Sequence, residues 1–306
     1  MGKIKGHIAI LVANIIFGLG VPVSKFLLDE NNPWVTPMTY MASRCLGATL
    51  IFWVVSFFLP KEHVPLKDLL VIMIGGLIGV VVSQTLTAWA LVYTTPVYYS
   101  LIATLTPVAT MLMAAMFIGE KITNLKSLGV ILAILGAALM VIVNWKSEGG
   151  SNDLLGISLA ILSLITWVIY LLITRKVSQK YTAVTQMKWI FLVSSIAVMP
   201  FAWGEFSQTK LYGGQFSWEA ALAMAFIVVF ATVMGYFMIP YAMKYLKATT
   251  VSIYTNIQPI VASFVAIAYG MDLLTWDKPL AAVLVLAGAY IVTLEPKEKE
   301  KNPQDI

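Results

Sequence analysis

The stretch Ala90–Val141 reads ALVYTTPVYYSLIATLTPVATMLMAAMFIGEKITNLKSLGVILAILGAALMV. It returns in altered form as Ala242–Thr293, AMKYLKATTVSIYTNIQPIVASFVAIAYGMDLLTWDKPLAAVLVLAGAYIVT. A constant offset of 152 residues aligns the two copies without a gap, so that Pro107 meets Pro259. Self-similarity at a fixed period indicates an internal structural repeat. We therefore expect two halves of the same architecture.

The composition indicates that lipid is the solvent of this chain. Of its 306 residues, 59% are hydrophobic and 11% are charged, and the mean hydropathy is +0.86. Soluble domains carry about 25% charged residues, which they need to cover a core with a polar surface. A chain with so few charges is expected to be an integral membrane protein.

Apolar runs that are long enough to cross a bilayer follow one another along both halves, since a helical crossing takes about 20 residues. The sequence predicts an all-α integral membrane protein with ten transmembrane helices in two five-helix repeats, 7–144 and 154–294, and a cytoplasmic tail, 295–306. The expected spans are 7–27, 35–59, 67–92, 97–118, 126–144, 154–175, 184–203, 218–243, 249–270 and 277–294.

An odd number of spans in each half turns the second half upside down relative to the first, which is the inverted repeat found in many carriers. With the amino terminus in the cytoplasm, fourteen Lys and Arg lie on the cytoplasmic side and four on the outer side. This bias predicts a multi-pass protein of the plasma (inner) membrane with both termini in the cytoplasm. The net charge of +5 then reflects topology, and no nucleic-acid partner is expected.

The residues that enzymes and pumps use are missing from the predicted spans. No phosphate-binding GxxxxGK[ST] motif occurs, and all fifteen acidic residues and both histidines lie at span ends, in loops or in the tail. No buried carboxylate is therefore available as a general base or a proton relay. The single Cys45 is interpreted as a small buried apolar residue. We predict no catalytic residue, no metal site and no cofactor.

Short motifs at matching places in both halves resemble the EamA repeat of the drug/metabolite transporter superfamily. The matching residues are Ile15-Ile16-Phe17-Gly18, Ser43-Arg44, Ala90-Leu91-x-Tyr93-Thr94, Pro107 and Gly119-Glu120-Lys121 in the first half, and Thr166-Trp167, Ala242-Met243-x-Tyr245 and Pro259 in the second. The Gly-Glu-Lys motif is replaced by Met271-Asp272-Leu273 in the second half. The resemblance covers residues 8 to 294.

This resemblance implies a secondary membrane carrier that moves small metabolites by alternating access around a central cavity. Amino acids or related compounds, moved outward, are the cargo that the resemblance suggests. The alternative is a non-transporting membrane protein that acts as a partner, a scaffold or a lipid scramblase. Small residues such as Gly129, Gly136 and Ala137 would then serve dimerisation. The sequence leaves open whether the protein is a monomer or a homodimer.

Arg44 is the most informative single residue for a binding site. It lies about ten residues into the second span, or roughly 15 Å deep at the helical rise per residue. Placing a guanidinium there costs at least about 2.5–3.5 kcal/mol on insertion scales, so a compensating partner is expected. The partner is either a carboxylate or phosphate of the substrate, or backbone carbonyls and water in a structural role.

The paired prolines, Pro107 and Pro259, predict helix breaks in the fourth and ninth spans. A proline removes one backbone donor, and such interruptions are tolerated where they line a cavity or where neighbours satisfy the freed carbonyl. Thr104 and Thr106 in the first copy, and Asn256 and Gln258 in the second, lie one to three residues upstream of these prolines. They are expected to line the cavity near the bilayer midplane; the alternative is ordinary hydrogen bonding between helices.

The remaining candidates for substrate contacts are polar or aromatic residues on other spans. Asn14 and Trp167 come from the first span of each half, and Gln84 aligns with Tyr236 at the repeat offset. Tyr99 opens the fourth span. The two tyrosines suit stacking against a substrate, although core packing explains them equally well. Amides, hydroxyls, aromatic rings and one arginine together suit a small zwitterion or another small metabolite.

Overall fold

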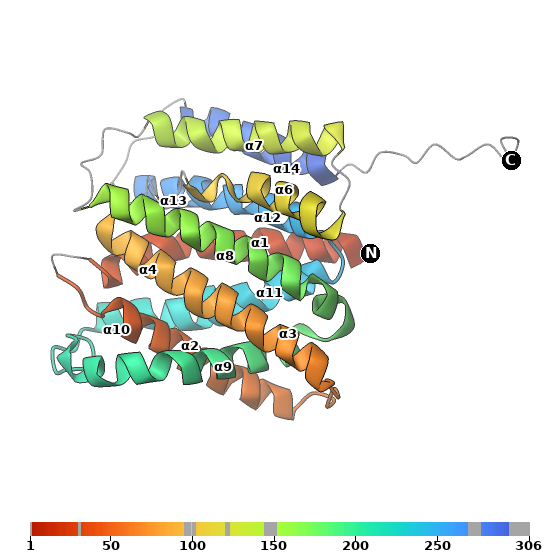
Figure 1. Ribbon diagram of the computed structural model, residues 1–306. Helices are drawn as coiled ribbons and strands as arrows, with labels where there is room; N and C mark the ends of the chain where they lie inside the picture. The colour runs from red at the N-terminus through yellow and green to blue at the C-terminus, as the bar shows by residue number, and fades with distance from the viewer. Residues whose placement is uncertain are drawn as a thin grey trace, which may run out of the picture.

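The chain forms a bundle of helices packed side by side (Figure 1). The computed structural model describes residues 2–29, 32–94, 99, 102–119, 123–143, 152–268 and 277–293. Every regular element in these ranges is helical, as the sequence predicts. The predicted tail 295–306, Glu120, Lys121 and Met271-Asp272-Leu273 lie outside the described residues.

The elements of the first half follow the predicted spans within a few residues, except where the fourth span begins. They are α1 (Gly2–Leu27), α2 (Pro37–Phe57), α3 (Leu66–Gly76), the π-helical η1 (Leu77–Val82), α4 (Ser83–Tyr93), α6 (Thr106–Ile118) and α7 (Asn124–Val143).

The second half repeats this order. Its elements are α8 (Asp153–Lys180), α9 (Ala183–Ala202), the 3₁₀ turn η2 (Trp203–Gln208), α10 (Trp218–Phe226), the π-helical η3 (Ile227–Met234), α11 (Gly235–Met243), α12 (Ala248–Ile253), the 3₁₀ turn η4 (Tyr254–Asn256), α13 (Ile257–Ala268) and α14 (Asp277–Thr293).

Six helical segments among the described residues are long and apolar enough to cross a membrane. They are Gly2–Leu27, Pro37–Phe57, Leu66–Tyr93, Leu154–Lys180, Ala183–Gln208 and Trp218–Met243. Two shorter apolar helices, Thr106–Phe117 and Asn124–Gly136, fall in the fourth and fifth predicted spans. The chain is thus a multi-pass membrane protein, and the exact number of ten spans stays a prediction.

The two halves interlock in a way that reflects the repeat. Helix α4 of the first half packs against α8, and its repeat partner α11 packs against α1. If the two halves are exchanged, the α4–α8 contact becomes the α11–α1 contact. A twofold relation between the repeats requires this correspondence. The equivalent helices α7 and α14 pack against each other, lying side by side at one edge of the bundle (Figure 1).

The pair of equivalent helices α2 and α9 runs antiparallel, which is the expected consequence of an inverted repeat. Glu62, just after α2 ends, accepts hydrogen bonds from the backbone N–H and the hydroxyl of Thr182, the residue that caps the start of α9. At the other end, Thr36, which caps the start of α2, donates to Glu205 just after α9 ends. The same carboxylate-to-cap contact therefore closes both ends of the pair.

Irregular helix segments also occur in matching pairs. The π-helical segments η1 and η3 interrupt the third and eighth predicted spans, and the repeat offset places η1 on the last six residues of η3. The α-helix of the fourth and ninth predicted spans is interrupted just before Pro107 and Pro259, by a turn at Thr104–Leu105 and by η4. Each proline lies in the first turn of the next helix, where its missing N–H costs little.

Glycines allow the closest helix approaches. A Cβ added to Gly79 would lie 2.3 Å from the Tyr170 ring, and one added to Gly75 would lie 2.5 Å from Thr174. A Cβ on Gly288 of α14 would lie 2.5 Å from the carbonyl oxygen of Gly129 in α7. Gly129, which the alternative of a non-transporting protein assigns to dimerisation, therefore packs against another helix of the same chain.

Candidate functional site

A cavity of about 130 Å³ lies between the two halves of the bundle. Residues of both repeats line it, from α1, α2, α4, α6, α8, η3, α11, α12 and α13. Along α1 and just beyond it, the lining runs from Ile10 to Leu28, so the cavity follows most of this helix toward the end where it finishes. This volume holds several water molecules or a small metabolite.

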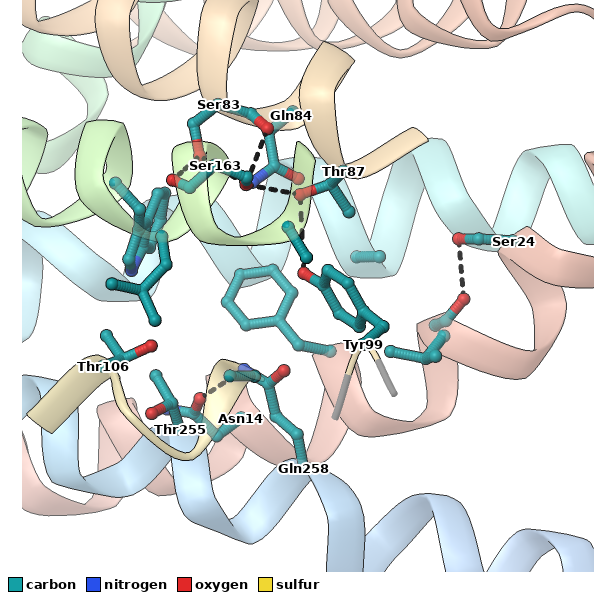
Figure 2. A pocket seen from close by; sticks show the side chains of 18 of the residues that line it. Asn14, Ser24, Ser83, Gln84, Thr87, Tyr99, Thr106, Ser163, Thr255 and Gln258 are labelled. Atoms are coloured by element: carbon teal, nitrogen blue, oxygen red, sulfur yellow. Dashed lines mark hydrogen bonds between the residues drawn. The ribbon is translucent and has the colours of Figure 1, made fainter. Parts of the chain in front are cut away.

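One wall carries a chain of hydroxyl groups (Figure 2). The side chains of Ser83 and Ser163 each donate to the other's backbone carbonyl, at 3.0 and 2.9 Å. The hydroxyl of Thr87 lies 2.8 Å from that of Ser163 and 3.4 Å from that of Tyr99. These bonds join α4 to α8 and to Tyr99, and they fix the direction in which the hydroxyls point.

The opposite wall carries amides and hydroxyls from α1, α6 and the α12–α13 region (Figure 2). Gln258 donates from Nε2 to Oδ1 of Asn14 at 2.8 Å, and Asn14 donates to the carbonyl of Ile10 at 2.8 Å. Thr106 and Thr255 lie beside this pair. Because the repeat offset aligns Thr106 with Gln258, equivalent positions of both halves contribute to the same wall.

Arg44 enters the cavity from α2 and is buried, with 6% of its surface exposed. Its Nε donates to the hydroxyl of Thr232 at 2.9 Å, and its Nη1 makes a long contact with Oε1 of Gln84 at 3.4 Å. The guanidinium carbon lies 5.3 Å from the centre of the Tyr40 ring and 5.9 Å from that of Tyr236, within cation–π range.

Thr232 can hold Arg44 because of the π-helical segment. Its hydroxyl donates to the carbonyl of Ile227, five residues earlier, at 2.8 Å. This i−5 bond uses the wider turn of η3, and the same oxygen accepts from Arg44. A π-helical turn frequently marks a functional site, and here it positions the one buried guanidinium of the described residues.

Tyr236 anchors an aromatic cluster at the cavity. Its ring makes edge contacts with Phe17, Trp167 and Phe191, with centroids 5.6–5.9 Å apart. Only 1% of Tyr236 is exposed, so its ring is fixed by packing. It thus serves the core and lines the cavity at the same time.

The structure brings most of the predicted site residues together. Seven of them line the cavity: Asn14, Arg44, Gln84, Tyr99, Trp167, Tyr236 and Gln258. Thr104 and Asn256 are buried but lie outside its lining, and both polar atoms of the Asn256 amide lack a hydrogen-bond partner among the described residues. Pro107 and Pro259 follow the two breaks. The role of all these residues in binding or gating stays a prediction.

Sequence reasoning missed several lining residues that helical spacing could have found. Tyr40 precedes Arg44 by four residues, and Ser163 precedes Trp167 by four, so each pair shares a helix face. Phe17 follows Asn14 by three residues. Ser24 lies one turn short of the end of α1, where its hydroxyl is 2.7 Å from that of Tyr40. Nothing in its neighbourhood in the sequence indicates that contact.

The end of the bundle that carries the amino terminus is packed shut around α1. His7 Nδ1 lies 2.8 Å from the hydroxyl of Tyr254, which joins α1 to η4. Added Cβ atoms on Gly2 and Gly6 would lie 2.9 Å from Tyr245 and 3.1 Å from Leu246. The cavity therefore does not reach this end along α1.

A multi-pass helical membrane protein with two interlocked repeats and a polar cavity between them is the architecture of a membrane transporter. The chain matches the EamA-like transporter family over residues 4–142 and 154–294, and it belongs to that family, within the drug/metabolite transporter superfamily.

Relatives with this architecture are themselves named transporters. An uncharacterized transporter of Archaeoglobus fulgidus is 25% identical over 85% of this chain and 89% of its own length. The uncharacterized transporter YyaM of Bacillus subtilis is 23% identical, with 92% of this chain and 91% of its own length covered. A solved crystal structure with 15% identity superposes with a TM-score of 0.74, covering 96% of this chain and 98% of that chain, and supports the fold alone.

Proposed function

We propose that this protein is a secondary carrier that moves small metabolites across the plasma (inner) membrane by alternating access around the cavity between its halves. The observation that carries the proposal is the cavity itself. It is lined by both repeats, it contains a buried guanidinium and two polar walls, and it is packed shut at one end. The expected cargo is an amino acid or a related metabolite, and the direction suggested by the resemblance is outward.

The predicted topology determines which side of the membrane the cavity would face. With both termini in the cytoplasm, the end where α1 finishes would face outward, and cargo would approach the cavity from that side. Cargo would bind between the repeats, and rocking of one half against the other would then open the cavity inward. The interlocked pairs α4–α8 and α11–α1 are the surfaces along which the halves would move.

Flux through the purified protein tests the proposal. Proteoliposomes loaded with a mixture of amino acids and small organic acids would be diluted into buffer, and the retained metabolites measured by mass spectrometry. Loss of a subset of metabolites, absent from protein-free vesicles, is the expected result. Equal retention of every metabolite with and without protein would contradict it.

A matched pair of variants in η3 shows whether flux uses the cavity. Ala231 lines the cavity, whereas Val229, two residues earlier, is 40% exposed at the outer surface of the bundle. Ala231→Leu fills part of the cavity and is expected to abolish flux, while Val229→Leu leaves it unchanged. Equal flux through both variants would place the path elsewhere.

A further inference from the structure

Within the described parts of the chain, the positive charge of Arg44 meets no acidic side chain. Its described contacts are with the hydroxyl groups of Thr232 and Tyr236, the amide oxygen of Gln84, the sulfur of Met41 and the rings of Tyr40 and Tyr236. All of these groups are neutral. An arginine side chain stays protonated in proteins, so a full positive charge lies at the wall of the cavity.

Among the residues described by the structure, no carboxylate lines the cavity to balance this charge. The residues that line the cavity include no aspartate and no glutamate, and the ion pair described for the chain, Lys180–Asp68, involves an exposed lysine outside the lining. A buried charge is costly unless it is paired. A negative charge on a bound molecule is therefore the partner that this site lacks.

The neutral polar groups of the cavity differ from Arg44 because they already have partners. Ser83, Ser163 and Thr87 are joined to one another, and Asn14 is joined to Gln258. The guanidinium carries five N–H donors, and its described contacts leave capacity for another acceptor. The Arg44 guanidinium is thus the group in the cavity that most needs a further partner, and the partner that suits it is one anionic group.

We propose that the preferred cargo is a small organic monoanion, with one carboxylate bound by Arg44 and an apolar body packed against Phe17, Trp167 and Tyr236. This inference rests on the proposed carrier function, but it replaces the amino acid expected from the resemblance with a related metabolite that carries a carboxylate and no ammonium group. A zwitterionic amino acid would bring an ammonium group that meets no carboxylate in the lining. A phosphate ester carries a charge of about −1.5 to −2 at neutral pH, more than one guanidinium balances.

Three ligands with one carbon skeleton separate these possibilities. The probes are 4-methylpentanoate, which is an anion, leucine, which adds an α-ammonium group, and 4-methylpentanamide, which is neutral. Binding to the purified protein would be measured by isothermal titration calorimetry. The acid is expected to bind at least about tenfold more tightly than the other two, because the amide has no charge to pair with Arg44 and leucine adds an ammonium group that the lining does not pair.

Two variants test whether Arg44 is the cause. Arg44→Gln is expected to remove the preference for the acid. Gln84→Glu keeps the size of the side chain and places a carboxylate where the amide oxygen now lies 3.4 Å from Nη1. This internal counter-ion is expected to abolish binding of the acid without a loss of thermal stability, so the test stands even if Arg44→Gln fails to fold.

The inference would be overturned if leucine or the amide bound as tightly as the acid, or if the acid did not bind at all. Unchanged binding of the acid to the Gln84→Glu variant would overturn it as well. The outcome is independent of flux. If the acid binds selectively but nothing crosses proteoliposomes, the carrier function fails and the ligand class stands. If zwitterions are carried and acids are not bound, the carrier function stands and the ligand class fails.

Discussion

At the scale of the residue, Arg44 depends on Thr232. The Thr232 side chain is completely buried, donates to the carbonyl of Ile227 and accepts from the guanidinium. Thr232→Val keeps the shape but leaves both groups without their partner. Leaving a buried polar group unpaired costs about 1–3 kcal/mol. We expect a lower unfolding midpoint in detergent, and Thr232→Ser, which retains the hydroxyl, should lie close to the wild type.

An unfolding midpoint for Thr232→Val equal to that of Thr232→Ser would contradict this role. It would mean that water or another side chain replaces the hydroxyl at no cost.

Sequence reasoning identified Arg44 because an intramembrane guanidinium is rare and expensive. It did not separate Thr106 and Gln258, which line the cavity, from Thr104 and Asn256, which do not. All four lie within three residues of a proline. A turn at Thr104–Leu105 and the 3₁₀ turn η4 break the regular helical spacing at these positions, so spacing along the chain does not show which side chains face the cavity.

At the scale of the element, close packing holds η1 against α8. The Tyr170 ring is fully buried, and a Cβ on Gly79 would lie 2.3 Å from it. Gly79→Ala should therefore push the two helices apart and destabilise the protein by about 1–3 kcal/mol, as overpacking does. Gly204→Ala is the control, since nothing lies within 4 Å of its added Cβ. Thermal unfolding of both variants would measure the difference, and equal midpoints would contradict the packing argument.

The contact between Glu62 and the start of α9 should make stability depend on pH. Partial burial alone would raise the pKa of Glu62, but hydrogen bonds from Thr185 and Thr182 and the charge of Lys244 lower it below its usual value. The carboxylate therefore stabilises the fold above the ordinary glutamate pKa, and this contribution is lost as the pH falls through the lowered folded-state pKa.

We expect the unfolding midpoint of Glu62→Gln to fall less between neutral and acidic pH than that of the wild type. Because the contact is largely exposed, the effect should be small. The same midpoints measured for Glu62→Asp, which keeps the charge, provide the comparison. A parallel pH dependence of wild type and Glu62→Gln would show that this contact does not contribute.

The predicted spans match the helices of the bundle closely, because bilayer thickness fixes the length of an apolar run. The π-helical segments could not be predicted in the same way. They lie where distant parts of the chain meet, as Gly79 meets Tyr170 and Thr232 meets Arg44. No local preference of the residues in η1 or η3 indicates them.

At the scale of the whole molecule, the two ends of the bundle differ although the halves are related. The α2–α9 pair carries the same type of contact at both ends, Glu62–Thr182 and Glu205–Thr36. Along α1, by contrast, the two ends differ: His7–Tyr254 and the packing of Gly2 and Gly6 close the first turns, whereas the cavity lining continues toward the end where α1 finishes. A difference between the two ends of related halves is what the proposed alternating-access mechanism needs in each of its states.

Cysteine accessibility from both sides of the membrane tests this alternation most directly. In a Cys45→Ala background, Thr87→Cys places a thiol on the cavity wall, while Ser207→Cys and Lys61→Cys place thiols at exposed positions of opposite ends. Each variant would be treated with a membrane-impermeant maleimide in right-side-out and in inside-out vesicles. The two end positions should each react from one side only. Thr87→Cys should react from both sides; reaction from one side alone would contradict alternating access and leave a fixed crevice in its place.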